Sequence, residues 1–158
     1  MCKKGQHTIS ISFLTLSIRL FLTLALLFEF VIDGPPVSQQ ARRRERVRQW
    51  RDEVRRAAEQ HWPAGELPAT GPVMLTITYF YESVSMDIDN IPKPISDALK
   101  GLVYLDDEQV TDVVCRKRDL NSSLRIERPS SVLADGLSRG NEFLYIVVEE
   151  APDQEVIS

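Results

Sequence analysis

The chain has 158 residues, which is enough for one domain with a sizeable core. Its composition, 43% hydrophobic and 27% charged, excludes a disordered or fibrous protein. The formal net charge of −4 argues only weakly against a nucleic-acid partner, because the two signs are segregated along the chain. Cys2 and Cys115 are too few for a disulfide framework or a thiolate zinc site, which indicates a reducing compartment such as the cytoplasm.

The N-terminal segment is apolar. It begins with Lys3 and Lys4 and continues as a run from Ile9 to Phe28 that Arg19 interrupts. About 20 apolar residues suffice to cross a bilayer, so a membrane anchor is one interpretation. A cleaved signal peptide fits less well, because no small-residue cleavage pattern follows the run. We favour a third interpretation, in which residues 1–27 are an extension ahead of the folded domain or arise from a misplaced start.

The first predicted strand is Phe28–Asp33, which ends at the turn-forming sequence Gly34-Pro35-Pro36. From Gln39 to His61 apolar residues recur every three or four positions, so we expect an amphipathic helix with Ser38 as its N-cap. After a loop rich in Pro and Gly, Val73–Tyr81 alternates apolar residues with Thr and predicts a half-buried strand.

A second, shorter helix is expected after this strand. Asn90 or Asp89 is its predicted N-cap, and Pro92 is tolerated in the first turn. Gly101 is expected to weaken or end the helix. Its predicted buried face consists of Ile91, Ile95, Ala98, Leu99 and Leu102.

The remaining chain predicts strands at Val110–Asp119 and Asn141–Glu150, with a short strand at Leu124–Glu127. We expect mobility in the stretch Asn121–Gly140, which is rich in Ser and Arg. The order of the elements predicts an α+β fold, a mixed β-sheet with two helices packed on one face. We expect this domain to span residues 28–150, with an acidic tail at 151–158.

The segment MDIDNIPKPISDALKGLVYLDDEQV, residues 86–110, concentrates carboxylates. If the chain is extended there, Asp87 and Asp89 project from the same side. Without a cation one of the two carboxyl groups would have a raised pKa, whereas a divalent metal lets both stay ionised. Oxygen ligands without His or Cys favour Mg²⁺ or Mn²⁺ over Zn²⁺.

A second acidic pair, Asp106 and Asp107, follows the predicted helix, and folding the helix onto the sheet is expected to bring it near the first pair. Lys93 lies in the first helical turn, where it can reach a phosphate or the charge that develops on a leaving oxygen. Asp97, four residues later, is expected to pair with Lys93 or to support the site. Carboxylates, Mg²⁺ and one lysine together are typical of a phosphodiester-cleaving site.

This segment resembles the D-x-D-N-x-x-K-x-x-x-D-A-L…D-D-x-Q-V signature of the RusA family of Holliday-junction resolvases. The resemblance extends from Phe28 to Glu150 through the order of the flanking elements. The matching residues are Asp87, Asp89, Asn90, Lys93, Asp97, Ala98, Leu99, Asp106, Asp107, Gln109 and Val110.

The resemblance implies that Asp87, Asp89 and Asp107 are metal-binding catalytic carboxylates and that Lys93 is an essential lysine. Asn90, Asp97 and Asp106 are expected in supporting positions, and Asn90 has the helix cap as an equally good interpretation. The family further implies a homodimer that binds four-way DNA junctions and nicks two opposed strands symmetrically. Each cut would leave a 5′-phosphate and a 3′-hydroxyl.

Arginines supply the expected DNA contacts, because Arg and Lys bind phosphates without reading sequence. The first helix and the strand Val110–Asp119 carry them, and alternation along that strand turns Lys117 to the opposite face from its neighbours. The proposed DNA-binding residues are Arg42, Arg43, Arg44, Arg46, Arg116 and Arg118. We expect Arg116, Lys117 and Arg118 to extend the basic surface towards the cleavage site.

These observations predict a cytoplasmic, Mg²⁺-dependent endodeoxyribonuclease that resolves branched DNA as a homodimer in recombination and repair, with Mn²⁺ as an alternative metal. One rival is a non-catalytic branched-DNA binder of the same fold. The carboxylates argue against it, because a protein that only binds phosphates has no use for clustered negative charge. The other rival is a membrane-anchored interaction protein that uses the segment from Ile9 to Phe28.

Overall fold

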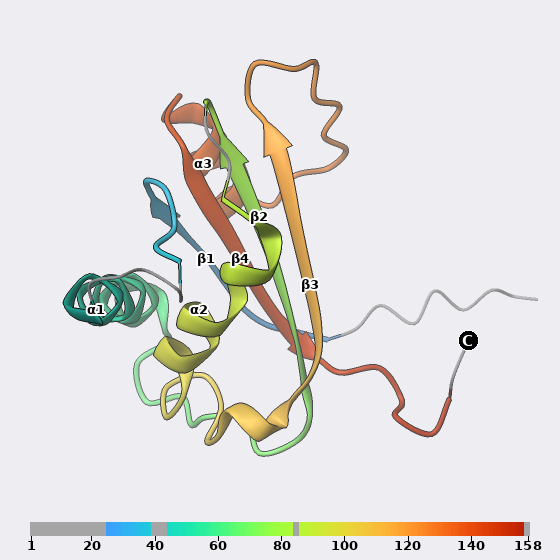
Figure 1. The fold of residues 1–158 in the computed structure, drawn as a ribbon. Coiled ribbons are helices and arrows are strands. Elements are labelled where there is room, and N and C mark those ends of the chain that lie inside the picture. The colour runs from blue at the N-terminus through green and yellow to red at the C-terminus, as the bar shows by residue number, and fades with distance from the viewer. Residues whose placement is uncertain (1–24, 39–43, 84–85, 157–158) are drawn as a thin grey trace, which may run out of the picture.

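A four-stranded mixed sheet forms the centre of the computed structural model, which describes residues 25–38, 44–83 and 86–156. The strands are β1 (Leu26–Asp33), β2 (Val73–Tyr81), β3 (Val110–Asp119) and β4 (Phe143–Glu150), in the order β1-β4-β2-β3. β4 is antiparallel to both neighbours, whereas β2 and β3 are parallel. Parallel neighbours need a long crossover, and this crossover contains the whole acidic segment (Figure 1).

Two helices cover one face of the sheet, as the sequence predicts: α1 (Arg44–His61) and α2 (Pro92–Leu99). α1 buries Val47, Trp50, Val54 and Ala58, which lie three or four residues apart and therefore share one side of the helix. With the buried side chains of α2 and alternate residues of the strands, they form the main hydrophobic core. The α+β fold with a mixed sheet is confirmed.

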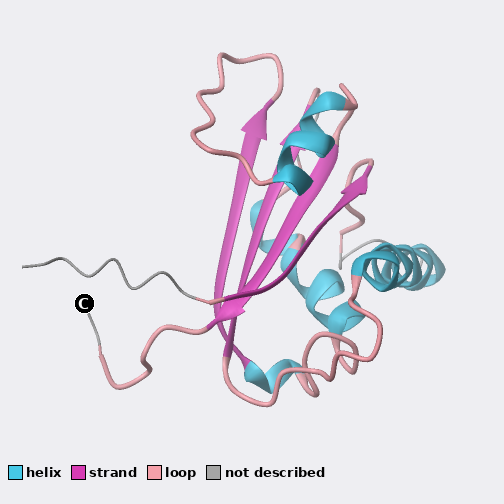
Figure 2. Cartoon of the chain, turned by 180° about the vertical axis from the view of Figure 1, so that it is seen from behind, coloured by secondary structure: helices cyan, strands magenta, loops and turns pink. Residues whose placement is uncertain are grey.

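A third helix, α3 (Ser131–Ser138), covers part of the opposite face and was not predicted (Figure 2). Ser130 caps it by accepting a hydrogen bond from the Leu133 amide. Its close approach depends on Gly136, where an added Cβ would lie 2.7 Å from the Phe143 ring. The expectation of a loop over Asn121–Gly140 was therefore wrong for its second half, which contains α3.

Two local details differ from the prediction. The short strand at Leu124–Glu127 was wrong, because these residues form no strand. α2 has Ile91 as its N-cap and no side-chain cap bond, so Asn90 and Asp89 do not cap it. The reason is the preceding 3₁₀ turn η1 (Ile88–Asn90), which includes both residues.

The apolar N-terminal run lies mostly outside the described residues, as does the predicted start of the first helix at residues 39–43. The end of that run belongs to β1, where Leu26 pairs with Glu149 and Phe28 with Val148. The first strand thus begins two residues earlier than predicted. Among the described residues no helix is long and apolar enough to span a membrane.

Candidate functional site

The first acidic pair lies at η1, at the start of the crossover from β2 to β3: Asp87 is the N-cap of this turn and Asp89 is inside it. Asp87 is extended, with φ −64° and ψ 137°, but Asp89 is inside the 3₁₀ turn, which the Asn90 amide closes on the Asp87 carbonyl at 3.2 Å. The alternation expected for an extended chain therefore does not apply here. Both carboxylates are exposed, and neither has a hydrogen-bond or ion-pair partner within the described part of the chain.

Lys93 joins α2 to the second acidic pair. Its Nζ lies 2.7 Å from Asp97 Oδ1 and 2.6 Å from Asp107 Oδ2. The pairing with Asp97 is the i, i+4 contact that the sequence predicts. The hydrogen bond from Lys93 is the main reason that the pKa of the Asp107 carboxyl lies well below its usual range, and the same bond raises the pKa of Lys93.

Lys100 is a second cation at this site, and no role was predicted for it from the sequence. Its Nζ lies 2.5 Å from an oxygen of Asp106 and 3.4 Å from Asp107 Oδ1. Each oxygen of Asp107 therefore faces a lysine ammonium. The signal was present in the sequence, because Lys93 and Lys100 are the only cations among the acids of this segment.

Asp97 also binds Arg51 of α1, with 2.8 Å between Arg51 Nη2 and Asp97 Oδ2. This contact completes a line of alternating charges from one helix to the end of the crossover, which we call the ion-pair chain. Its members are Arg51, Asp97, Lys93, Asp107, Lys100 and Asp106. The chain fixes Lys93 between two carboxylates.

A short 3₁₀ turn, η2 (Asp107–Gln109), positions the second acidic pair. Asp106 is its N-cap and accepts a hydrogen bond from the Glu108 amide, while Gln109 Oε1 accepts one from the Asp106 amide. This is a reciprocal capping box. Tyr104 ties the preceding loop to α2 by donating to the Ser96 carbonyl at 2.8 Å, and burial raises the pKa of Tyr104 to about 12.

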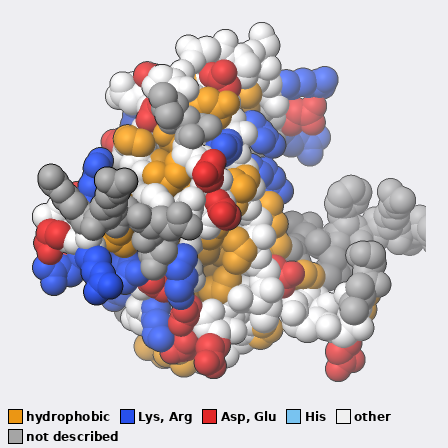
Figure 3. Space-filling model, viewed as in Figure 1, with side chains coloured by type: hydrophobic (Ala, Val, Ile, Leu, Met, Phe, Trp, Pro, Cys, Tyr) orange, Lys and Arg blue, Asp and Glu red, His pale blue; other side chains and the backbone are white. Residues whose placement is uncertain are grey.

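The two acidic pairs are not gathered into one metal-binding set. Among the described residues, no three acidic, His or Cys side chains are placed so that they could hold a metal ion. Figure 3 shows acidic atoms over η1 near the middle of this face and, separately, acidic and basic atoms interleaved towards its lower edge. The donors suit Mg²⁺ by chemistry, since it prefers carboxylate oxygens. In the structure, however, the oxygens of Asp107 are already paired with lysines.

The arginines expected to bind DNA fall into three groups. Arg42 and Arg43 lie outside the described residues, and Arg44 and Arg46 are exposed on α1. Arg116 and Arg118 line a pocket with Leu124, Arg125 and Leu133 on the α3 side of the sheet.

For Arg116 and Arg118, the expectation of a basic surface that extends towards the predicted catalytic residues is therefore wrong. The alternation of strand β3 sends Lys117 to the other face, where its Nζ donates to the Met86 carbonyl at 3.0 Å. Lys117, rather than either arginine, borders the first acidic pair.

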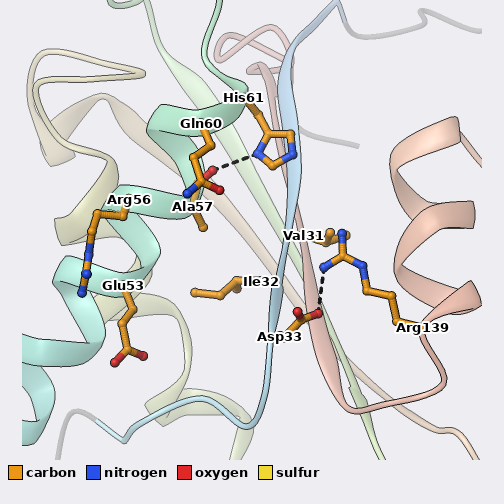
Figure 4. A pocket seen from close by; sticks show the side chains of 9 residues that line it. All are labelled: Val31, Ile32, Asp33, Glu53, Arg56, Ala57, Gln60, His61 and Arg139. Atoms are coloured by element: carbon orange, nitrogen blue, oxygen red, sulfur yellow. Dashed lines mark hydrogen bonds and ion pairs between the residues drawn. The ribbon is translucent and has the colours of Figure 1, made fainter.

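A pocket lies elsewhere, between the end of α1, strand β1 and the end of α3 (Figure 4). Its volume is about 510 Å³, and it contains the 2.9 Å ion pair between Arg139 and Asp33. His61 lies on its rim with Nδ1 2.9 Å from the Ala57 carbonyl oxygen. None of the predicted catalytic residues lines it.

Comparison with known proteins agrees with the resemblance. No curated protein matches the chain. Residues 35–127, more than half of the chain, match the family described as Endodeoxyribonuclease RusA, and this range includes both acidic pairs and both site lysines. The chain belongs to the RusA endodeoxyribonuclease family.

Proposed function

We propose that the protein is a divalent-metal-dependent endonuclease that resolves four-way DNA junctions by paired symmetric nicks, as a homodimer acting in recombination and repair in the cytoplasm. The observation that carries the proposal is the Lys93–Asp107 contact of 2.6 Å. It connects the second acidic pair to the first turn of α2, directly after the η1 turn with Asp87 and Asp89. Family membership supports nuclease activity on branched DNA in general.

In this proposal Asp87, Asp89 and Asp107 hold Mg²⁺, with Mn²⁺ as a substitute. Such an ion would stabilise negative charge on a phosphodiester and make a water molecule more acidic. The two exposed carboxylates on η1 are accessible as ligands without any rearrangement. Asp107 must first exchange its lysine partners.

Lys93 is proposed to bind the DNA phosphate. Its side chain is 52% exposed, and Asp97 can hold its ammonium group when Asp107 turns away. An ammonium ion beside the scissile phosphate stabilises the charge that develops in the transition state. Arg44 and Arg46, both exposed on the neighbouring helix, are proposed to bind the backbone of a DNA arm.

The domain boundaries that we propose, residues 28–150 with tails on either side, need a correction of two residues at the start, because β1 begins at Leu26. The homodimer is proposed because a two-fold dimer matches a two-fold junction, with one site for each of the two cuts.

Cleavage of a labelled four-way junction tests the function. The full-length protein is incubated with the junction or with linear duplex of the same sequence, in Mg²⁺ or EDTA. We expect paired nicks in the junction only, lost in EDTA and reduced at least a hundredfold by Asp89→Asn. Asp153→Asn, a change at an exposed aspartate far along the chain, should cleave like the wild type.

The other outcomes identify the rivals. Tight junction binding without nicks in Mg²⁺ or Mn²⁺ would favour the non-catalytic binder. No binding and no cleavage, with the protein recovered in the membrane fraction of cells, would favour the membrane-anchored interaction protein. Nicks in duplex and junction alike would reject the structure-selective activity while leaving a nuclease.

A further inference from the structure

Lys100 has a fixed backbone and a side chain that reaches into the site. It is the C-cap of α2, and Gly101 follows in the left-handed region with φ +72°, which ends the helix. Arg55 of α1 donates a hydrogen bond to the Lys100 carbonyl at 2.7 Å. The side chain is 45% exposed and ends between Asp106 and Asp107. The ammonium group can therefore change partners without moving the helix.

The two lysines on Asp107 are not equivalent. Lys93 lies 2.6 Å from Oδ2, a short charge-assisted hydrogen bond, and it has Asp97 as a second partner on its own helix. Lys100 lies 3.4 Å from Oδ1, so this contact is the weaker of the two. A divalent cation that binds Asp107 competes with an ammonium ion for an oxygen, and the contact with Lys100 is the easier one to replace.

We propose that Lys100 has two alternative partners: the carboxylates of Asp106 and Asp107 in the metal-free protein, and a phosphate of the DNA backbone once a divalent cation has engaged Asp107. The inference rests on the proposed function and adds a positively charged residue to the DNA-binding surface of the same site. A lysine ammonium is a compact, strongly hydrated charge on a flexible stem, which suits such an exchange.

Two expectations of opposite sign follow from this exchange. Removing Lys100 should strengthen metal binding in the absence of DNA, because a competing cation next to Asp107 is gone. The same change should weaken DNA binding in the presence of metal, because a phosphate contact is gone. A residue that only stabilises the fold would not produce both effects.

The first measurement is Mn²⁺ binding to the full-length protein without DNA. The electron paramagnetic resonance signal of the free ion reports how much Mn²⁺ is bound. Lys100→Met should bind Mn²⁺ more tightly, by about fivefold, the scale of one exposed ion pair. Arg139→Gln is the matched control, since Arg139 also lies between two carboxylates, Asp33 and Asp135, on the α3 side. The control should leave Mn²⁺ affinity unchanged. Equal or weaker Mn²⁺ binding by Lys100→Met would overturn the proposal.

The second measurement is the salt dependence of four-way-junction binding, in a fixed concentration of Ca²⁺ or in EDTA, with the DNA checked to be uncut. Each phosphate contact adds about 0.9 to the slope of log K against log salt concentration. In Ca²⁺ the slope of Lys100→Met should be shallower than that of the wild type by about 0.9, whereas in EDTA the two slopes should agree.

Equal slopes in Ca²⁺, or the same reduction in both buffers, would overturn the role of Lys100. If the wild type still cleaves the junction in Mg²⁺, the proposed function survives that result. If the wild type neither binds nor cleaves the junction, the proposed function fails and the DNA contact of Lys100 fails with it.

Discussion

Gln109 uses every hydrogen-bonding group of its side-chain amide. Its Oε1 accepts from the amides of Leu105 and Asp106 at 2.8 and 2.9 Å, and its Nε2 donates to the carbonyls of Ala69 and Gly71 at 2.9 and 2.8 Å. It therefore attaches the loop with the second acidic pair to the segment before β2. This gives a structural reason for a glutamine two residues after Asp107.

We expect Gln109→Ala to lower the free energy of unfolding by about 1–2 kcal/mol, because four backbone polar groups lose their hydrogen-bond partner. Gln109→Glu should cost a similar amount, because a carboxylate cannot donate to two carbonyl oxygens. Urea unfolding measures both, and Gln60→Ala, at an exposed position of α1, is the control. Wild-type stability in Gln109→Glu would show that the two donated bonds are unimportant.

Asp107 makes stability depend on pH at the acidic end. Its pKa is lowered in the folded protein, chiefly by Lys93, whereas in the unfolded chain it is about 3.9. The unfolded state then binds a proton that the folded state does not, so stability rises with pH in this range. The contribution of Asp107 to folding stability is fully present above about pH 5. It is lost as the pH falls towards the pKa that Asp107 has in the folded protein.

The corresponding experiment is urea unfolding in EDTA at several values between pH 3 and pH 6. Asp107→Asn should lose less stability on acidification than the wild type does, because the perturbed carboxyl is gone. Asp153→Asn should show the full wild-type loss. Identical pH profiles for Asp107→Asn and the wild type would contradict the Lys93–Asp107 pair as a source of stability.

At the scale of the elements, the periodicity of apolar residues predicted those strands and helices whose two sides have different surroundings in the fold. β2 and β3 have the predicted bounds, because their alternation reflects two faces with different surroundings. α1 was recognisable from its buried stripe. α3 was not, since eight residues that bury only Gly136 fully carry too little pattern to distinguish them from a loop.

The candidate site was predictable in its residues and not in its arrangement. The resemblance selected Asp87, Asp89, Lys93 and Asp107, but no spacing rule indicates that Asp107 would face two lysines. Contacts between distant segments, such as Arg51 with Asp97, depend on how α1 lies beside α2. Local sequence gives no information on that packing.

Arg55 holds these two helices together. Its Nη1 lies 3.3 Å from the Ala98 carbonyl oxygen and 2.7 Å from that of Lys100, where the helix leaves carbonyl groups unpaired. A cation at a helix C-terminus also interacts favourably with the helix dipole. We expect Arg55→Ala to lower the free energy of unfolding by about 1 kcal/mol.

Arg56→Ala is the control for this change, because Arg56 is exposed on the same helix and, within the part of the chain that the structure describes, its side chain bonds to the Asp52 carbonyl of that helix alone. The change should alter the free energy of unfolding by less than about 0.5 kcal/mol. If the two variants unfold at the same urea concentration, α2 is held by its apolar face alone.

At the scale of the whole molecule, the sheet separates two kinds of surface. The α1 and α2 face carries the ion-pair chain and the acidic pairs, and the α3 face carries Arg116 and Arg118. The family match covers residues 35–127 and so leaves out β1 and β4. Yet β4 lies between β1 and β2, and its Leu144, Ile146 and Val148 are fully buried in the main core. The matched region therefore depends on strands from both ends of the chain.

This dependence predicts where the chain can be shortened. A chain from Ala25 retains the bond from the Glu150 amide to the Ala25 carbonyl, at 3.0 Å, and all of β1. A chain from Phe28 loses that bond and Leu27, which packs against the main core, so its unfolding free energy should be lower by about 1–2 kcal/mol. A chain from Gly34 lacks the buried side chains of β1 altogether and should not fold.

Urea unfolding measures the stability of the chains from Ala25 and Phe28. The dispersion of NMR signals shows which of the three chains fold. Folding of the chain from Gly34 would mean that residues 35–127 and β4 suffice, which the burial of Phe30 at 0% exposure argues against. Equal stability of the chains from Ala25 and Phe28 would mean that the first two residues of β1 add nothing to the sheet. If the order of stability is as expected, junction cleavage by the chain from Ala25 then tests whether the nuclease site needs anything before β1.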